Sequence, residues 1–223
     1  MFVALAVLTY CTGLIAMIPA RFVLPDSDRM RVGGTAWNGE AVVGSTMRIV
    51  WRWSPMASLL RFGYTANWQM TGGDTDLSGS ATPKAGRIVL RDISGQIDGT
   101  ALDAAAPALP LSCRFLAQVD LARLTIGGRD QLADGTLRTS AVHCTARLAG
   151  AGAGARALDL PSLRGTLVPG AGLTTGALVT PSRQHLIEAR LTSDGGLSVW
   201  ATPELAARTP LLAGARYDTV IAR

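Results

Sequence analysis

A regular alternation of apolar and polar residues does most to limit the folds open to this chain. In residues 60–70 the two kinds alternate without a break, with Leu60, Phe62, Tyr64, Ala66, Trp68 and Met70 as the apolar set. Residues 47–53 alternate in the same way. Because successive side chains of a β-strand point to opposite faces, this period predicts two strands with one apolar face each. The Ser54 and Pro55 break predicts a connection between them, and hence an antiparallel pair.

Further short strands are expected in residues 87–93, 114–126, 137–148, 165–168, 176–179, 186–191 and 197–201. Asp-Gly and Gly-Gly pairs lie between many of them and supply the positive φ of tight hairpins. Residues 101–110 are expected to form a loop and 150–155 a flexible connection, while Thr202 and Pro203 predict a short capped helix. The expected fold class is all-β, either an antiparallel sandwich or an open β-groove.

The first twenty residues contain no charged side chain. A helix of this length spans about 30 Å, the thickness of the hydrocarbon core of a bilayer. A cleaved signal peptide is the alternative, but no basic residue precedes the apolar stretch and no clear A-x-A site follows it. We therefore expect one transmembrane anchor at 1–20, a linker at 21–33 and a β-rich domain at 34–223.

Nothing in the sequence predicts catalysis, a cofactor or a metal site. His143 precedes Cys144, but neighbours in a strand point to opposite faces, so they would not form a Cys–His nucleophile. The net charge is +5, yet the arginines are scattered without a basic run, which disfavours nucleic-acid binding. Cys113 and Cys144 predict either one disulfide, in an oxidising compartment, or two buried free thiols.

Aromatic residues gather in the first third of the chain, where Trp37, Trp51, Trp53 and Trp68 lie. Core packing is the ordinary explanation for such a set, since one buried Trp removes about 150–250 Å² from water. The alternative is an exposed apolar groove for a lipid chain or a partner strand.

A Gly-Thr-Ala-Trp-Asn-Gly element at 34–39 is followed by Trp51, Trp53 and Pro55. This order resembles the start of the type II secretion system protein N (GspN) family. That family has one anchor, a proline-containing exit, a GT-[VA]-W-[NS]-G element and a strand with W-x-[LW]-x-P. The matching residues in this chain are Gly34, Thr35, Trp37, Asn38 and Gly39, followed by Trp51, Trp53 and Pro55. The resemblance is clearest over residues 18–55 and looser over the rest.

The resemblance implies a single-pass bacterial inner-membrane protein with a periplasmic β-rich domain. It implies a non-enzymatic assembly scaffold that contacts other secretion-system proteins during export of folded proteins across the outer membrane. A periplasmic lipid-binding or lipid-transfer β-groove is the alternative function. Taken alone, the positive-inside rule would place the domain in the cytoplasm, because Arg21, Arg29 and Arg31 follow the apolar stretch.

Overall fold

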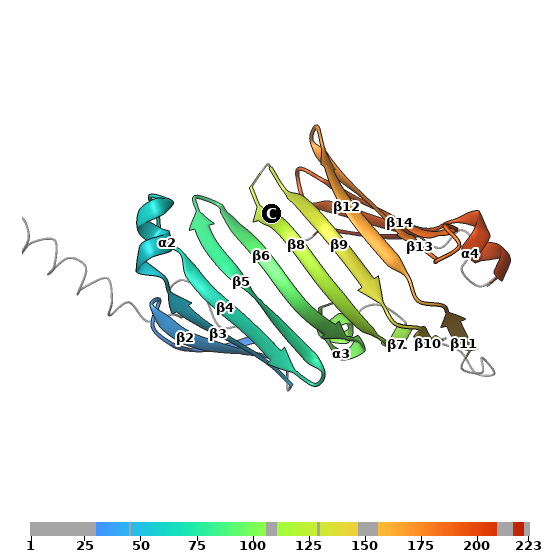
Figure 1. Ribbon diagram of the computed structural model, residues 1–223, viewed down its shortest axis with the longest axis horizontal. Helices are drawn as coiled ribbons and strands as arrows, with labels where there is room; N and C mark the ends of the chain where they lie inside the picture. Colours follow the sequence, from blue (N-terminus) through green and yellow to red (C-terminus); the bar gives the residue numbers. More distant parts are fainter. Residues whose placement is uncertain are drawn as a thin grey trace, which may run out of the picture.

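We describe the protein from a computed structural model, over residues 30–44, 46–105, 111–128, 130–146, 156–208 and 216–220. Within these ranges the chain is all-β, with two antiparallel sheets and three short helices (Figure 1). The expected anchor at 1–20 lies outside the described residues. Among the residues that are described, no helix has both the length and the apolar character needed to cross a membrane.

The large sheet contains thirteen strands, and each strand is antiparallel to its neighbours. In sheet order they are β1 (Met30–Gly34), β2 (Asn38–Val43), β3 (Met47–Trp53), β4 (Ala66–Gly72), β5 (Thr75–Lys84), β6 (Arg87–Asp98), β8 (Leu116–Gly127), β9 (Leu132–Thr139), β12 (Arg164–Gly170), β13 (Leu173–Val179), β14 (His185–Thr192), β15 (Gly196–Ala201) and β16 (Arg216–Val220). Neighbouring strands follow one another in the chain except where further strands are inserted, after β6 and after β9.

The inserted segments form the second, three-stranded sheet, in the order β11 (Arg156–Leu160), β10 (Val142–Ala146) and β7 (Leu111–Arg114). The helix α3 (Gly99–Ala105) leads into β7. The other two helices connect strands of the large sheet: α2 (Pro55–Leu60) follows β3, and α4 (Pro203–Arg208) follows β15. The main core cluster lies where this small sheet and α4 meet the large sheet. Its buried members are Cys113, Val142, Cys144, Leu160, Leu163, Leu186 and Leu205.

The register of the large sheet separates apolar from polar side chains from β1 to β12. Directly paired residues point to the same face, so one face carries a continuous apolar row. This apolar row runs through Val32, Ala41, Ile49, Met70, Leu77, Gly95, Val119, Leu137, Gly165, Leu178, Ile187 and Ala201. All of its members except Gly95 are buried or half-buried.

The neighbouring row of paired residues points to the other face and is exposed. This polar row consists of Arg31, Val42, Arg48, Thr71, Asp76, Gln96, Gln118, Arg138 and Arg164. Figure 1 shows the sheet as bent, with strands at both ends turned behind the central ones. The alternation expected from the sequence therefore continues from strand to strand from β1 to β12, whereas β13 and β15 do not alternate between exposed and buried residues.

Several expectations for single elements are confirmed. The strand at 47–53 is β3, and it pairs antiparallel with β4. The short helix after Thr202 is α4, and the Thr202 hydroxyl accepts a hydrogen bond from the Leu205 N–H at 3.5 Å. Thr136 and Thr166, the centres of two similar Gly-Thr-Leu segments, pair directly with each other across β9 and β12.

Other expectations need correction. Residues 60–65 do not extend β4, because α2 ends at Leu60 and a turn leads to Ala66. Residues 137–148 are not one strand, since β9 ends at Thr139 and β10 begins at Val142. The loop expected at 101–110 starts as part of α3, and β1 begins at Met30 within the expected linker. The connection expected at 150–155 lies outside the described residues.

Candidate functional site

The residues that carry the family resemblance come from three neighbouring strands and meet at one end of the sheet. Gly34 ends β1 and pairs with Gly39 of β2, which in turn pairs with Trp51 of β3. Trp53 ends β3, and Pro55 begins α2. The two sequence elements therefore form a single structural unit.

Four aromatic rings define this unit, which we call the tryptophan cluster: Trp37, Trp51, Trp53 and Tyr64. The Trp37 and Trp53 rings meet edge-on with centroids 3.8 Å apart, and Trp37 and Tyr64 meet edge-on at 6.4 Å. The Tyr64 hydroxyl donates a hydrogen bond to the Ala36 carbonyl, and burial raises the pKa of that hydroxyl. All four rings are half-buried, so they pack at the end of the sheet outside the buried core.

Thr35 organises the turn between β1 and β2 from which Trp37 projects. Its hydroxyl oxygen accepts hydrogen bonds from the N–H groups of Trp37, at 3.3 Å, and Asn38, at 3.2 Å. Its carbonyl accepts one from Trp51 Nε1 at 3.2 Å. The threonine hydroxyl thus fixes the turn, while the backbone carbonyl of the same residue holds the Trp51 indole.

The glycines of the motif are explained by close contacts. A Cβ atom on Gly39 would lie 2.2 Å from Cζ2 of Trp51, so the indole occupies the place of a side chain. Gly34 has a φ of 82°, and a Cβ there would lie 2.6 Å from the Asn38 carbonyl oxygen. Sequence reasoning missed the matching pair on the next strands, where Trp68 packs over its cross-strand partner Gly79. The sequence did contain a sign of this contact, namely a glycine inside a strand next to the strand that contains a tryptophan.

An open hollow of about 590 Å³ lies beside the cluster, lined by Trp37, Asn38, Gly39, Val50, Trp51, Arg52 and Trp53. Arg52 is the one charged residue of this lining, and a general base, nucleophile or metal ligand set is missing from it. Aromatic faces and one cation suit packing or binding.

The histidines and cysteines do not form a reactive pair among the described residues. His143 Nδ1 contacts Asp159 Oδ1 at 2.6 Å on the exposed side of β10, whereas Cys144 is buried on the other side. Cys144 is bonded to Cys113, its direct partner across β7 and β10, with Cα atoms 4.0 Å apart. The disulfide, one of two alternatives left open by the sequence, is therefore the arrangement found. No group of three potential metal ligands occurs within the described ranges.

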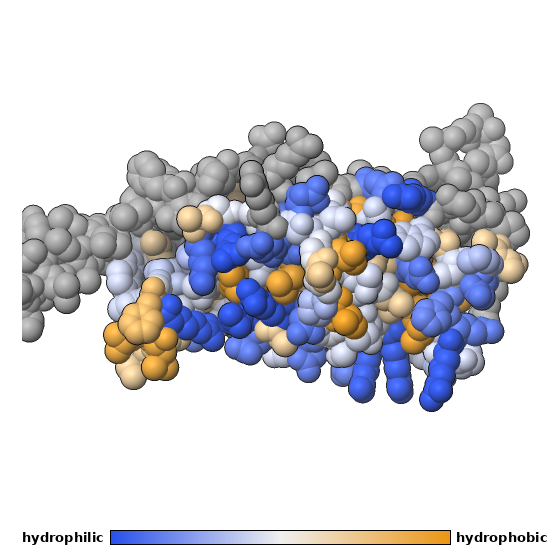
Figure 2. All heavy atoms as spheres, turned by 90° about the horizontal axis from the view of Figure 1, so that it is seen from above, coloured by the Kyte–Doolittle hydropathy of each residue, from blue (hydrophilic) through white to orange (hydrophobic). Residues whose placement is uncertain are grey.

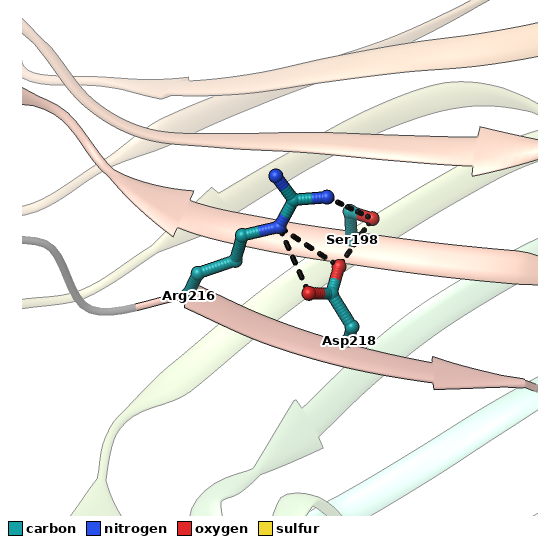
Figure 3. A network of polar contacts seen from close by, with 3 residues as sticks. All are labelled: Ser198, Arg216 and Asp218. Atoms are coloured by element: carbon teal, nitrogen blue, oxygen red, sulfur yellow. Dashed lines mark hydrogen bonds and ion pairs between the residues drawn. The ribbon is translucent and has the colours of Figure 1, made fainter.

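The last strand of the large sheet is fastened by a polar network (Figure 3). Asp218 of β16 accepts a hydrogen bond from the Ser198 hydroxyl of β15 at 2.5 Å, and Arg216 Nε donates to both carboxylate oxygens at 2.8 and 3.0 Å. The Ser198 hydrogen bond, followed by the contact with Arg216, holds the pKa of Asp218 below its ordinary value. Within the part of the chain that the structure describes, β16 and β1 are the two end strands of this sheet.

A scan against protein-family models found no match for this chain, and a search of curated proteins found no match either. The family of the chain therefore stays the expectation drawn from the motifs in residues 18–55.

Proposed function

We propose that this chain is an inner-membrane-anchored, non-enzymatic component of the type II protein secretion system, acting as an assembly scaffold for export of folded proteins. The observation that carries the proposal is that the motif at residues 34–39 and the motif at residues 51–55 pack together in one tryptophan cluster. The disulfide adds support, because such bonds persist in oxidising compartments such as the periplasm.

The end strands of the large sheet offer a way to bind neighbours. An edge strand has unpaired backbone groups that a strand from another protein can use. Among the described residues β1 and β16 are the end strands of the sheet, and Arg31 of β1 is exposed. The scaffold thus recruits other secretion-system proteins by strand addition at an edge.

Two measurements test this function. Removing the chain from its bacterium should trap secreted enzymes in the periplasm, and normal secretion without it would refute the proposal. A photo-crosslinking residue at Arg31 should then capture a secretion-system protein, while the same residue at Arg138, exposed in the central strand β9, should not. Equal capture at both positions would contradict edge recognition.

The apolar row favours a second candidate, a lipid-binding β-groove. Twelve strands contribute paired residues to this row, and the sheet that carries it is bent (Figure 1). In this interpretation the bend makes an open groove, and acyl chains lie along the apolar row from Val32 to Gly165. At the other end of the row, Leu178, Ile187 and Ala201 already pack against the core cluster. The hydrophobic effect would drive their binding.

Val119 and Gln118 allow a matched test of lipid binding, because they are neighbours in β8 on opposite faces. Val119 is half-buried in the apolar row and Gln118 is exposed in the polar row. Lipid should co-purify with the wild type and with Gln118→Asp and be lost from Val119→Asp, as measured by mass spectrometry. Lipid-free wild-type protein, purified in mild detergent, would rule out this candidate.

A further inference from the structure

The most exposed apolar surface of the described residues lies on α2 and the turn after it. Four large side chains there are mostly open to solvent: Met56 at 68%, Leu59 at 68%, Leu60 at 77% and Phe62 at 96%. We call this set the α2 knuckle. Figure 2 shows a protruding apolar cluster at the end of the molecule where Figure 1 places α2. Contiguous exposed apolar groups of this kind mark an interaction surface.

The knuckle is held in place by hydrogen bonds at its base. The Ser58 hydroxyl donates to the Ser54 carbonyl at 2.7 Å and accepts from Trp53 Nε1 and from the Thr65 N–H, both at 2.9 Å. Phe62 has a φ of 48°, the left-handed conformation usual just past a helix end, and backbone hydrogen bonds hold it there: Phe62 N–H to the Leu59 carbonyl at 3.3 Å and Gly63 N–H to the Ser58 carbonyl at 3.0 Å. The exposure of these side chains is therefore built into the fold.

Arginines flank α2 in the sequence, with Arg52 three residues before its first residue and Arg61 directly after its last. Both are exposed, and Arg61 donates a hydrogen bond to Ser80 and lies 3.8 Å from the carboxylate of Asp92. Arg48, farther along β3, is ion-paired with Glu40. The guanidinium groups of Arg52 and Arg61 beside the apolar side chains suit anionic lipid headgroups.

The shape and the neighbouring residues also suit a bilayer. A protruding group of flexible apolar side chains fits a fluid acyl layer without needing a matching groove in a partner. Trp53 and Tyr64, which pack at the base of the knuckle through the tryptophan cluster, are residues typical of the membrane–water interface. Short segments with an apolar side and basic neighbours insert at this depth.

We infer that the α2 knuckle inserts into the surface of an anionic bilayer and gives the β domain a second membrane contact. The inference rests on the proposed function in one respect, namely that the domain lies beside the inner membrane. Insertion at α2 would fix the rotation of the sheet relative to the bilayer, which a single anchor would leave free.

The test uses the full chain, with Cys11→Ser, in vesicles of phosphatidylethanolamine and phosphatidylglycerol. A polarity-sensitive fluorophore is attached at Phe62→Cys, or at Val168→Cys in β12 as the control. Val168 is also exposed, at 55%, and lies far from α2 in the sheet order. Acyl chains that carry a nitroxide quench only a fluorophore that enters the bilayer.

We expect a blue shift and a loss of emission at position 62 and neither at position 168. If the protein floats with the vesicles but the fluorophore at position 62 emits like the one at position 168, the inference is overturned. The proposed function as an anchored scaffold would not be affected by that result. Protein that fails to float would overturn both. Replacing Leu59 and Leu60 with Ser should reduce the quenching at 62, and because both are exposed this change should leave the unfolding midpoint unchanged.

Discussion

At the scale of single residues, Asp98 connects three parts of the fold. It ends β6 and is 8% exposed. One carboxylate oxygen accepts hydrogen bonds from the hydroxyls of Thr75, at 3.0 Å, and Thr100, at 2.6 Å, and from the Ala101 N–H at 3.2 Å. The other oxygen accepts from the Asp74 N–H at 3.0 Å. Asp98 thus caps α3 and holds the β4–β5 turn against it.

Stability should depend on the ionisation of Asp98. Burial alone would raise the pKa of Asp98, but the hydrogen bonds from Thr100, Asp74, Thr75 and Ala101 outweigh it and lower the pKa below its ordinary value. Because the folded-state pKa is lowered, the ionised carboxylate contributes stability that is fully present above the unfolded pKa of about 4. This contribution is lost as the pH falls through the folded-state pKa.

Asp98→Ala should therefore lower the free energy of unfolding by about 2–4 kcal/mol at neutral pH, through loss of a cap and of buried hydrogen bonds. In urea titrations the difference in free energy of unfolding between variant and wild type should become smaller as the pH is lowered below about 4. Asp120→Ala, at an exposed site in β8, is the control and should change little. A gap that does not vary with pH would contradict the ionised-cap explanation.

Gly39 makes a second prediction at this scale. Because the Trp51 indole lies where a Cβ would be, Gly39→Ala should displace the ring and cost about 1–3 kcal/mol. Gly63→Ala is a matched control, since its nearest atom, the Arg61 carbonyl oxygen, would lie at 3.9 Å. Thermal unfolding followed by tryptophan fluorescence compares the two. Equal midpoints would show that the cluster tolerates a methyl group.

At the scale of elements, the disulfide joins two insertions that are far apart in the chain. Cys113 in β7 and Cys144 in β10 are 31 positions apart, and the β8–β9 hairpin lies between them. Opening a loop of this length should cost about 3–4 kcal/mol in the chain-entropy model. We expect Cys113→Ser with Cys144→Ser to lower the urea midpoint while keeping the strand signal in circular dichroism. A wild-type midpoint unchanged by dithiothreitol would contradict this.

The elements that could be predicted were those whose side chains alternate clearly. β3 was predicted with its full length because Met47, Ile49, Trp51 and Trp53 all lie on one face. The same signal failed at Leu60, Phe62 and Tyr64, because Pro55 at the first helical turn starts α2 before the strand begins. Apolar and polar residues do alternate there, but these residues do not pair with a neighbouring strand.

β5 was missed for a different reason. The buried side chains of this strand include Thr75, Ser80 and Thr82, which are polar and small. The hydroxyls of Thr82 and Thr65 form a hydrogen bond at 3.1 Å. These buried side chains are therefore satisfied by hydrogen bonding, and the strand does not need apolar residues at those positions. For the candidate site, the sequence identified the motif residues but not the Trp–Gly contacts, because cross-strand register is set by the whole sheet.

At the scale of the whole molecule, the location of the β domain can be decided by topology. The proposed function predicts that alkaline phosphatase fused after Arg223 is active, because the domain and its disulfide would lie in the periplasm. A cytoplasmic reporter at the same position should be inactive. The opposite pattern would agree with the positive-inside rule and would remove the basis for a secretion role.

The order of strands in the large sheet also determines how the chain can acquire its structure. Most strands pair with the next one in the chain, so the contacts are local and little loop closure precedes each new hairpin. A chain that enters a compartment amino terminus first can add hairpins in the order in which they emerge. β6 and β9 each pair across an inserted segment, and β7 has no described partner until β10 arrives. Oxidation of Cys113 and Cys144 therefore reports that the first nine strands have already passed.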